Sequence, residues 1–251
     1  MINNLYENLK KGKIQIGLAY TFCAPGIIEC MGKESDFVWI DGQHGQFTYE
    51  GILNMVRAAD CIGVDSVVRV PGHDSGWLSL YADTGASAIM VPIVNNKEEA
   101  VHIAEQLNFA PYGKRSFGGQ RLVTKYGIDY NTKRKLMVIA QIETVEGIKN
   151  AHEIIAVEGI DMLFFGPADV KNEMGLKMSV GIFENKSLLE YVKITAKAAK
   201  AAGKLCGTVS TNIDEAKLLT EIGYTFFSCG VDSMFLKQGA NKYINEFLVL
   251  K

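Results

Sequence analysis

The chain alternates short hydrophobic runs with longer segments in which apolar residues recur at helical spacing. Longer segments such as 98–107, 146–155 and 188–202 predict helices. The short runs are rich in Val, Ile and Phe and predict eight strands, at 14–19, 37–41, 66–70, 88–94, 138–143, 162–166, 205–209 and 226–230. Repeated strand–helix units of this kind build a parallel sheet.

Eight strand–helix units in 251 residues predict a (β/α)8 (TIM) barrel of the α/β class. The composition is 48% hydrophobic and includes no low-complexity linker, so we expect residues 1–251 to form a single domain. An open doubly wound sheet is the main alternative. It would usually carry a glycine-rich nucleotide loop after its first strand, and the segment LAYTFCAPG at 18–26 contains none.

Charge and composition exclude several classes of partner. The formal net charge is −2 and the basic residues are scattered, so we expect no nucleic-acid partner. No segment approaches the roughly 20 apolar residues of a membrane span, and the amino terminus does not resemble a signal peptide. We therefore expect a cytoplasmic protein. The five cysteines form no C-x-x-C pair and mostly lie in apolar surroundings, which predicts reduced structural thiols.

Two connections, 110–135 and 172–186, are too long for minimal strand–helix units. Long connections in compact domains are often functional. We expect both to rise on the catalytic face, at the carboxyl ends of the strands.

Polar residues gather at the predicted carboxyl ends of the strands, where barrels of this class build their active sites. Individually, an Asp there can cap a helix, a His can be a solvated bystander, and an Arg can form a structural ion pair. Their convergence on one rim favours a catalytic site. The candidates are Asp41, His44, Arg69, Gln141, Glu143 and Asp169.

Glu143 and Asp169 follow adjacent strands, which lie about 4.8 Å apart, so both carboxylates can reach one cation. Oxygen ligands without cysteine favour Mg²⁺ or Mn²⁺. The backbone N–H groups of Ala168 and Asp169, at a predicted helix start, suit a substrate carboxylate. Arg69 can stabilise a developing enolate oxygen.

Several motifs together resemble the HpcH/HpaI family, the metal-dependent 2-oxo acid aldolases that include hydroxy-heptenedioate aldolase and citrate lyase. The resemblance covers nearly the whole chain. Its most specific parts are the Asp41-x-x-His44 turn, Gln141-x-Glu143, and Gly166-Pro167-x-Asp169. The other matching segments are VVRVPG, YADTGASAIMVPIVNNKEEA, APYGKRSFGGQR and FFSCGVDSMFL.

The resemblance implies a barrel of the phosphoenolpyruvate/pyruvate superfamily that reversibly cleaves a 4-hydroxy-2-oxo acid to pyruvate and an aldehyde. By this likeness Glu143 and Asp169 bind the divalent metal, Mg²⁺ or Mn²⁺, with Co²⁺ or Zn²⁺ as alternatives. Arg69 steadies the enolate. Gln141 and the backbone of Ala168 contact the pyruvate moiety.

The resemblance also implies that His44 is the general acid/base, in a turn oriented by Asp41, and that it pairs with Asp83 from a neighbouring subunit. The assembly implied is a homo-oligomer, a trimer of dimers, in which a C-terminal helix at about 232–249 packs across subunits. This sequence departs from the family in two places. Gln43 stands where Glu is common, and the segment NEMGLKMSVGIF at 172–183 replaces a proline-rich one.

Three alternatives stay open. A Schiff-base aldolase needs a lysine on a strand interior, whereas Lys204 precedes strand seven and Lys171 lies beyond Asp169. A phosphate-substrate enzyme would use the small polar loops GTVSTN and CGVDS after strands seven and eight. A thioester (acyl-CoA) lyase of the citrate lyase type would use Arg115 and Arg121 to hold an anionic tail.

Overall fold

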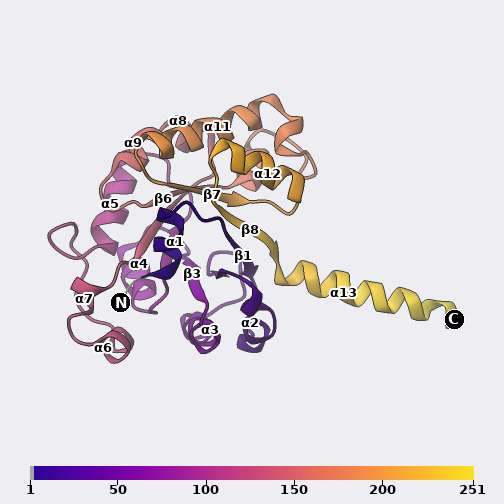
Figure 1. The fold of residues 1–251 in the computed structure, drawn as a ribbon, viewed down its shortest axis with the longest axis horizontal. Coiled ribbons are helices and arrows are strands. Elements are labelled where there is room, and N and C mark those ends of the chain that lie inside the picture. The colour runs from indigo at the N-terminus through magenta and orange to yellow at the C-terminus, as the bar shows by residue number, and fades with distance from the viewer. Residues whose placement is uncertain (1–2) are drawn as a thin grey trace.

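The computed structural model describes residues 3–251, and its eight parallel strands close into a barrel (Figure 1). Each strand pairs in parallel with the next, and β8 pairs with β1. The predicted (β/α)8 fold is confirmed. The strands are β1 (Gln15–Tyr20), β2 (Phe37–Asp41), β3 (Asp65–Arg69), β4 (Ala88–Val91), β5 (Met137–Ile142), β6 (Met162–Phe165), β7 (Leu205–Val209) and β8 (Phe226–Val231).

Helices surround the barrel as an outer layer (Figure 1). Short 3-10 helices lie at Gly32–Glu34, Ile182–Glu184 and Leu248–Leu250. The α-helices are α1 (Asn4–Lys10), α2 (Pro25–Met31), α3 (Tyr49–Ile62), α4 (Ser75–Ala82), α5 (Lys97–Leu107), α6 (Gln120–Tyr126), α7 (Tyr130–Lys133), α8 (Val145–Lys149), α9 (Ala151–Ala156), α10 (Pro167–Glu173), α11 (Lys186–Ala201), α12 (Ile213–Ile222) and α13 (Asp232–Phe247).

The strands read as continuous hydrophobic runs because both of their faces are buried. One face of each packs on the helices, and the other fills the barrel interior, where Trp39, Phe164 and Phe226 pack edge to face. Leu5 and Leu9 of α1 join this interior cluster. Because α1 precedes β1, it closes the amino end of the barrel and leaves the carboxyl end for polar side chains.

Some predicted boundaries differ from the structure. The fourth strand was expected to run to residue 94, but β4 ends at Val91 because Ile93 has a left-handed backbone with φ of 53°. The helix expected over 146–155 is two short helices that meet at Asn150.

The expectation that 110–135 rises on the catalytic face is wrong. This segment follows α5 and leads into β5, so it lies at the amino ends of the strands. Arg134 donates hydrogen bonds to the carbonyls of Gly85 and Ala86, just before β4, and Lys135 accepts one from Asn3 beside α1. The segment also contains α6 and α7. The other long connection, 172–186, lies as expected beside the start of α8, because Glu173 accepts the N–H of Val145.

The C-terminal helix α13 extends away from the barrel, to the right in Figure 1. It carries several exposed apolar side chains, including Leu236, Tyr243, Ile244 and Phe247. Among residues 3–251, no helix is both long enough and apolar enough to span a membrane.

Candidate active site

Asp41 and Arg69 form a buried ion pair at the carboxyl ends of β2 and β3. The two residues are register partners in the sheet. Arg69 donates Nε to Asp41 Oδ1 at 2.8 Å and Nη2 to Oδ2 at 2.6 Å. Each side chain is only 8% exposed. This bidentate geometry fixes the plane of the guanidinium and neutralises its charge.

Asp41 also orders the turn that follows β2. Its Oδ1 accepts the backbone N–H groups of Gln43 at 3.1 Å and His44 at 3.3 Å. Burial by itself would raise the pKa of Asp41, but the hydrogen bonds and charge of Arg69, with these two N–H groups, lower it below its ordinary value. Asp41 is therefore a carboxylate at neutral pH, and the turn that carries His44 is anchored to it.

A chain of contacts continues from Arg69 across the barrel mouth. Arg69 Nη1 lies 3.4 Å from Gln141 Oε1, and its guanidinium stacks 5.0 Å above the Trp39 ring. Gln141 in turn donates Nε2 to Glu143 Oε2. The predicted same-side placement of Gln141 and Glu143 is confirmed.

Glu143 is 1% exposed, and the backbone N–H of Ile93 donates to its Oε1 at 2.8 Å. Burial, and then the negative charge of Asp169, raise the pKa of Glu143 to about 7, against the opposing effects of Ile93 and Arg69. Glu143 is buried whereas Asp169 is exposed, and two neighbouring carboxylates destabilise each other's charge unless a cation joins them. The donor set therefore fits a divalent cation.

Gly166 allows the close approach between β6 and Glu143. A Cβ atom on Gly166 would lie 2.7 Å from Glu143 Cβ and 2.8 Å from its Oε2. Helix α10 starts one residue later at Pro167, and this places Ala168 and Asp169 in its exposed first turn. Asp169 lies close enough to Glu143 for its charge to raise the pKa of Glu143, and that both carboxylates bind one cation stays a prediction.

These two carboxylates are the residues that could hold a metal. Among residues 3–251, no group of three or more His, Cys, Asp and Glu side chains is arranged to enclose one. A cation held by Glu143 and Asp169 alone would keep most of its coordination positions for water and substrate oxygens, as is usual for Mg²⁺.

His44 and Asp83 are not brought together within the described part of one chain. His44 is exposed in the turn after β2. Asp83 follows α4 and receives a 2.6 Å hydrogen bond from Arg115 Nη2, on the side of the molecule where the 110–135 segment packs. A role for Asp83 beside His44 therefore requires a second subunit.

Sequence reasoning missed two residues at the site. Ile93 contributes only its backbone N–H, which no pattern of side chains reveals. Trp39 lies two residues before Asp41 on the same strand, so its inward direction follows from the alternation of side chains. The cysteines were expected to be structural thiols that mostly lie in apolar surroundings. This is wrong for three of them, since Cys23, Cys30 and Cys61 are exposed.

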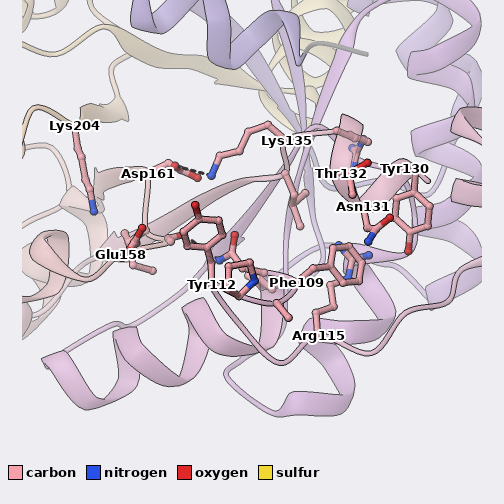
Figure 2. A pocket seen from close by; sticks show the side chains of 18 of the residues that line it. Phe109, Tyr112, Arg115, Tyr130, Asn131, Thr132, Lys135, Glu158, Asp161 and Lys204 are labelled. Atoms are coloured by element: carbon pink, nitrogen blue, oxygen red, sulfur yellow. Dashed lines mark hydrogen bonds and ion pairs between the residues drawn. The ribbon is translucent and has the colours of Figure 1, made fainter. Parts of the chain in front are cut away.

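A cavity of about 700 Å³ lies at the opposite, amino end of the barrel (Figure 2). Phe109, Tyr112 and Lys204 line it, together with the Lys135–Asp161 ion pair, whose nitrogen and oxygen lie 2.9 Å apart. Lys204 Nζ donates to two backbone carbonyls at 2.7 Å. Lys204 thus lies away from the polar rim, which argues against a Schiff-base mechanism there.

A family model described as HpcH/HpaI aldolase/citrate lyase matches residues 24–238. A 4-hydroxy-2-oxovalerate aldolase of Novosphingobium aromaticivorans is 34% identical over 95% of this chain and 92% of its own length. A hydroxypyruvate/pyruvate aldolase of Delftia acidovorans is 30% identical over 92% and 87%. The crystal structure of an HpcH/HpaI family protein from Burkholderia cenocepacia superimposes with a TM-score of 0.88, at 23% identity, over 98% of this chain and 99% of its own.

Proposed function

Because the chain belongs to the HpcH/HpaI aldolase/citrate lyase family, we propose that it is a divalent-metal-dependent aldolase that reversibly cleaves a 4-hydroxy-2-oxo acid to pyruvate and an aldehyde. The observation that carries the proposal is the pairing of Glu143 with Asp169 beside the Arg69–Gln141 contact, at the carboxyl end of the barrel. The names of its relatives support the same reaction class.

Glu143 and Asp169 would hold the cation, Mg²⁺ or Mn²⁺, with Co²⁺ or Zn²⁺ as alternatives. When bound, such an ion polarises the 2-oxo carbonyl and offsets negative charge on the enolate. Arg69 would donate to the oxygen on which that charge develops, because Asp41 already fixes the plane of its guanidinium. Gln141 and the backbone N–H of Ala168 would bind the pyruvate moiety.

His44 would act as the general base in the cleavage direction. It accepts the proton of the 4-hydroxyl, the C3–C4 bond breaks, the aldehyde leaves, and the bonding electrons pass to the enolate. The protonated imidazole of His44 then returns this proton to C3, directly or through water, which yields pyruvate and restores the neutral base. Asp83 of a neighbouring subunit would orient the imidazole, which requires a homo-oligomer such as a trimer of dimers. Residues 1–251 would form a single domain in each subunit, and the reaction would take place in the cytoplasm.

A first experiment measures pyruvate release from a panel of 4-hydroxy-2-oxo acids after chelation and after addition of Mg²⁺ or Mn²⁺. We expect activity to disappear with the chelator and to return with metal. Glu143→Gln and Asp169→Asn should abolish both metal binding and turnover. His44→Ala should lower turnover by about 10²- to 10⁴-fold and leave metal affinity unchanged. Full activity in chelated protein, or in His44→Ala, would contradict the proposal.

Within one chain, the two arginines that the thioester lyase alternative would use already have other partners. Arg115 pairs with Asp83 and stacks on the Phe109 ring, and Arg121 binds Asp60 and the Thr84 carbonyl. Neither guanidinium is free to hold an anionic tail. The loops after β7 and β8, which the phosphate-substrate alternative would use, are partly taken up by internal contacts, since Ser210 donates to Glu215 and Asp232 accepts from Thr21.

A further inference from the structure

Ile93 has a backbone conformation that its own side chain disfavours. Among residues 3–251 it is the single non-glycine residue with positive φ, at 53°. A left-handed conformation is unfavourable for an L-residue because of steric crowding at Cβ, and β-branched residues are rare there. The Ile93 side chain is 45% exposed, so core packing does not explain the conformation. Strain of this kind persists only where the surroundings impose it.

Residues 92–96 form the loop after β4, here called the β4 loop. The left-handed conformation of Ile93 points backbone N–H groups of this loop toward the carboxyl end of β5. The N–H of Ile93 lies 2.8 Å from Glu143 Oε1, and the N–H of Val94 lies 3.0 Å from the Gln141 carbonyl. The second oxygen of Glu143 accepts Nε2 of Gln141. Both oxygens of the carboxylate are therefore held, and the β4 loop supplies one of the two contacts.

His73, in the loop after β3, contacts the loop after β4 directly before Ile93. Its Nε2 lies 2.6 Å from the Pro92 carbonyl, directly before Ile93. Because a carbonyl only accepts, Nε2 must carry the proton. The His73 backbone is itself held, since its carbonyl lies 3.0 Å from Nε2 of His102 on α5. On the far side of the turn, Glu99 accepts the N–H of Asn95 at 2.8 Å.

We propose that His73 is a positioning residue for Glu143, acting through the Pro92 carbonyl and the left-handed turn at Ile93. The inference rests on the proposed role of Glu143 as a metal ligand. His73 touches neither the cation nor the substrate. His73 keeps the Ile93 N–H pointed at Oε1 of Glu143. The carboxylate therefore keeps the orientation in which it binds the cation. Partners that orient metal ligands in this way typically contribute about 10- to 100-fold in metal affinity.

The test is calorimetric titration of the full chain with MnCl2 alone at pH 8, where Glu143 is ionised. We expect His73→Ala to weaken Mn²⁺ binding by about 10- to 100-fold. His73→Gln should recover most of the affinity, because its amide can donate to the Pro92 carbonyl. His73→Asn should not, because its amide is one methylene shorter. His152→Ala is the matched control, since that imidazole is 69% exposed on α9, and it should bind as the wild type does.

The outcomes separate this inference from the proposed function. If the wild type binds no Mn²⁺, or if Glu143→Gln binds it normally, the metal site itself is wrong. If the wild type binds and Glu143→Gln does not, but His73→Ala retains full affinity with only a lower melting temperature, His73 is structural and the inference is overturned. Should His73→Ala fail to fold, equal affinities for His73→Gln and His73→Asn would overturn it.

Discussion

At the scale of single residues, Asp41 combines two tasks that depend on its being ionised. It neutralises Arg69 inside the barrel mouth, and it accepts the two N–H groups that shape the His44 turn. The lowered pKa of Asp41 reflects the excess of these interactions over the cost of burial. Any change that removes its charge leaves a buried guanidinium without a counter-ion.

Asp41→Asn should therefore destabilise the protein by about 3–5 kcal/mol, the range seen when one partner of a buried ion pair is removed. Urea unfolding at pH 7 measures the change. Asp214→Asn is the matched control, because Asp214 and Lys217 form an ion pair whose side chains are 83% and 67% exposed. The control should change stability by less than about 0.5 kcal/mol. Equal, small effects of both substitutions would show that the Asp41–Arg69 pair is not required for stability.

The raised pKa of Glu143 predicts an unusual pH dependence in metal-free protein. The pKa is about 7 in the folded chain and 4.5 ordinarily, so between these values the folded state binds more protons than the unfolded state. Stability contributed by this group is complete below pH 4.5 and is lost as pH rises to about 7, by on the order of 3 kcal/mol.

Unfolding free energies of chelated wild type and Glu143→Gln, measured from pH 4.5 to 8, test this dependence. The unfolding free energy of the wild type should fall relative to that of Glu143→Gln as pH rises. The difference between the two unfolding free energies should level off above pH 7. Added Mn²⁺ should reverse the trend, because the ionised carboxylate is the form that binds metal. A difference that does not vary with pH would contradict the raised pKa.

At the scale of elements, helix α1 closes the amino end of the barrel. Leu5 and Leu9 are 1% and 2% exposed within the interior cluster, at the end opposite the candidate site. Leu9→Ala should cost about 2–5 kcal/mol in urea unfolding and leave Mn²⁺ affinity unchanged. Leu218→Ala on α12 is the control, since that side chain is 42% exposed, and it should cost less. Loss of metal binding in Leu9→Ala would mean that the two barrel ends are coupled.

Most strands were predictable, because a strand buried on both faces leaves a run of apolar residues that is hard to mistake. The β2 run of Phe37–Asp41 matches its predicted bounds. The position of 110–135 was predicted wrongly. Because long connections are often functional, the segment was assigned to the catalytic face. A segment that follows a helix in this fold must return to the amino end of the next strand.

The site was predictable in so far as it consists of side chains at strand ends. The sequence left open that Arg69 forms a structural ion pair, and it does so with Asp41. Glu143 and Asp169 could be paired because β5 and β6 are neighbours. The Ile93 contact could not be predicted, because its donor is a backbone N–H in a conformation imposed by distant residues such as His73.

At the scale of the whole molecule, α13 exposes apolar side chains that no other element of the described chain covers. The helix extends away from the barrel, and Tyr243, Ile244 and Phe247 are each more than half exposed. Apolar side chains gathered in this way are characteristic of an interface between proteins. A second copy of the chain is the occupant consistent with the proposed assembly, in which the C-terminal helix packs across subunits.

If α13 packs across subunits, Ile244→Asp and Phe247→Asp should shift the protein to smaller species in sedimentation velocity. Asn245→Asp, which adds the same charge about 100° around the helix from Ile244, should sediment as the wild type does. Aldolase activity should fall with the assembly, since Asp83 would no longer reach a neighbouring His44, whereas Mn²⁺ affinity should persist because Glu143 and Asp169 belong to one chain. A monomeric variant with full activity would show that the catalytic groups are complete within one barrel and would remove Asp83 from the proposed mechanism.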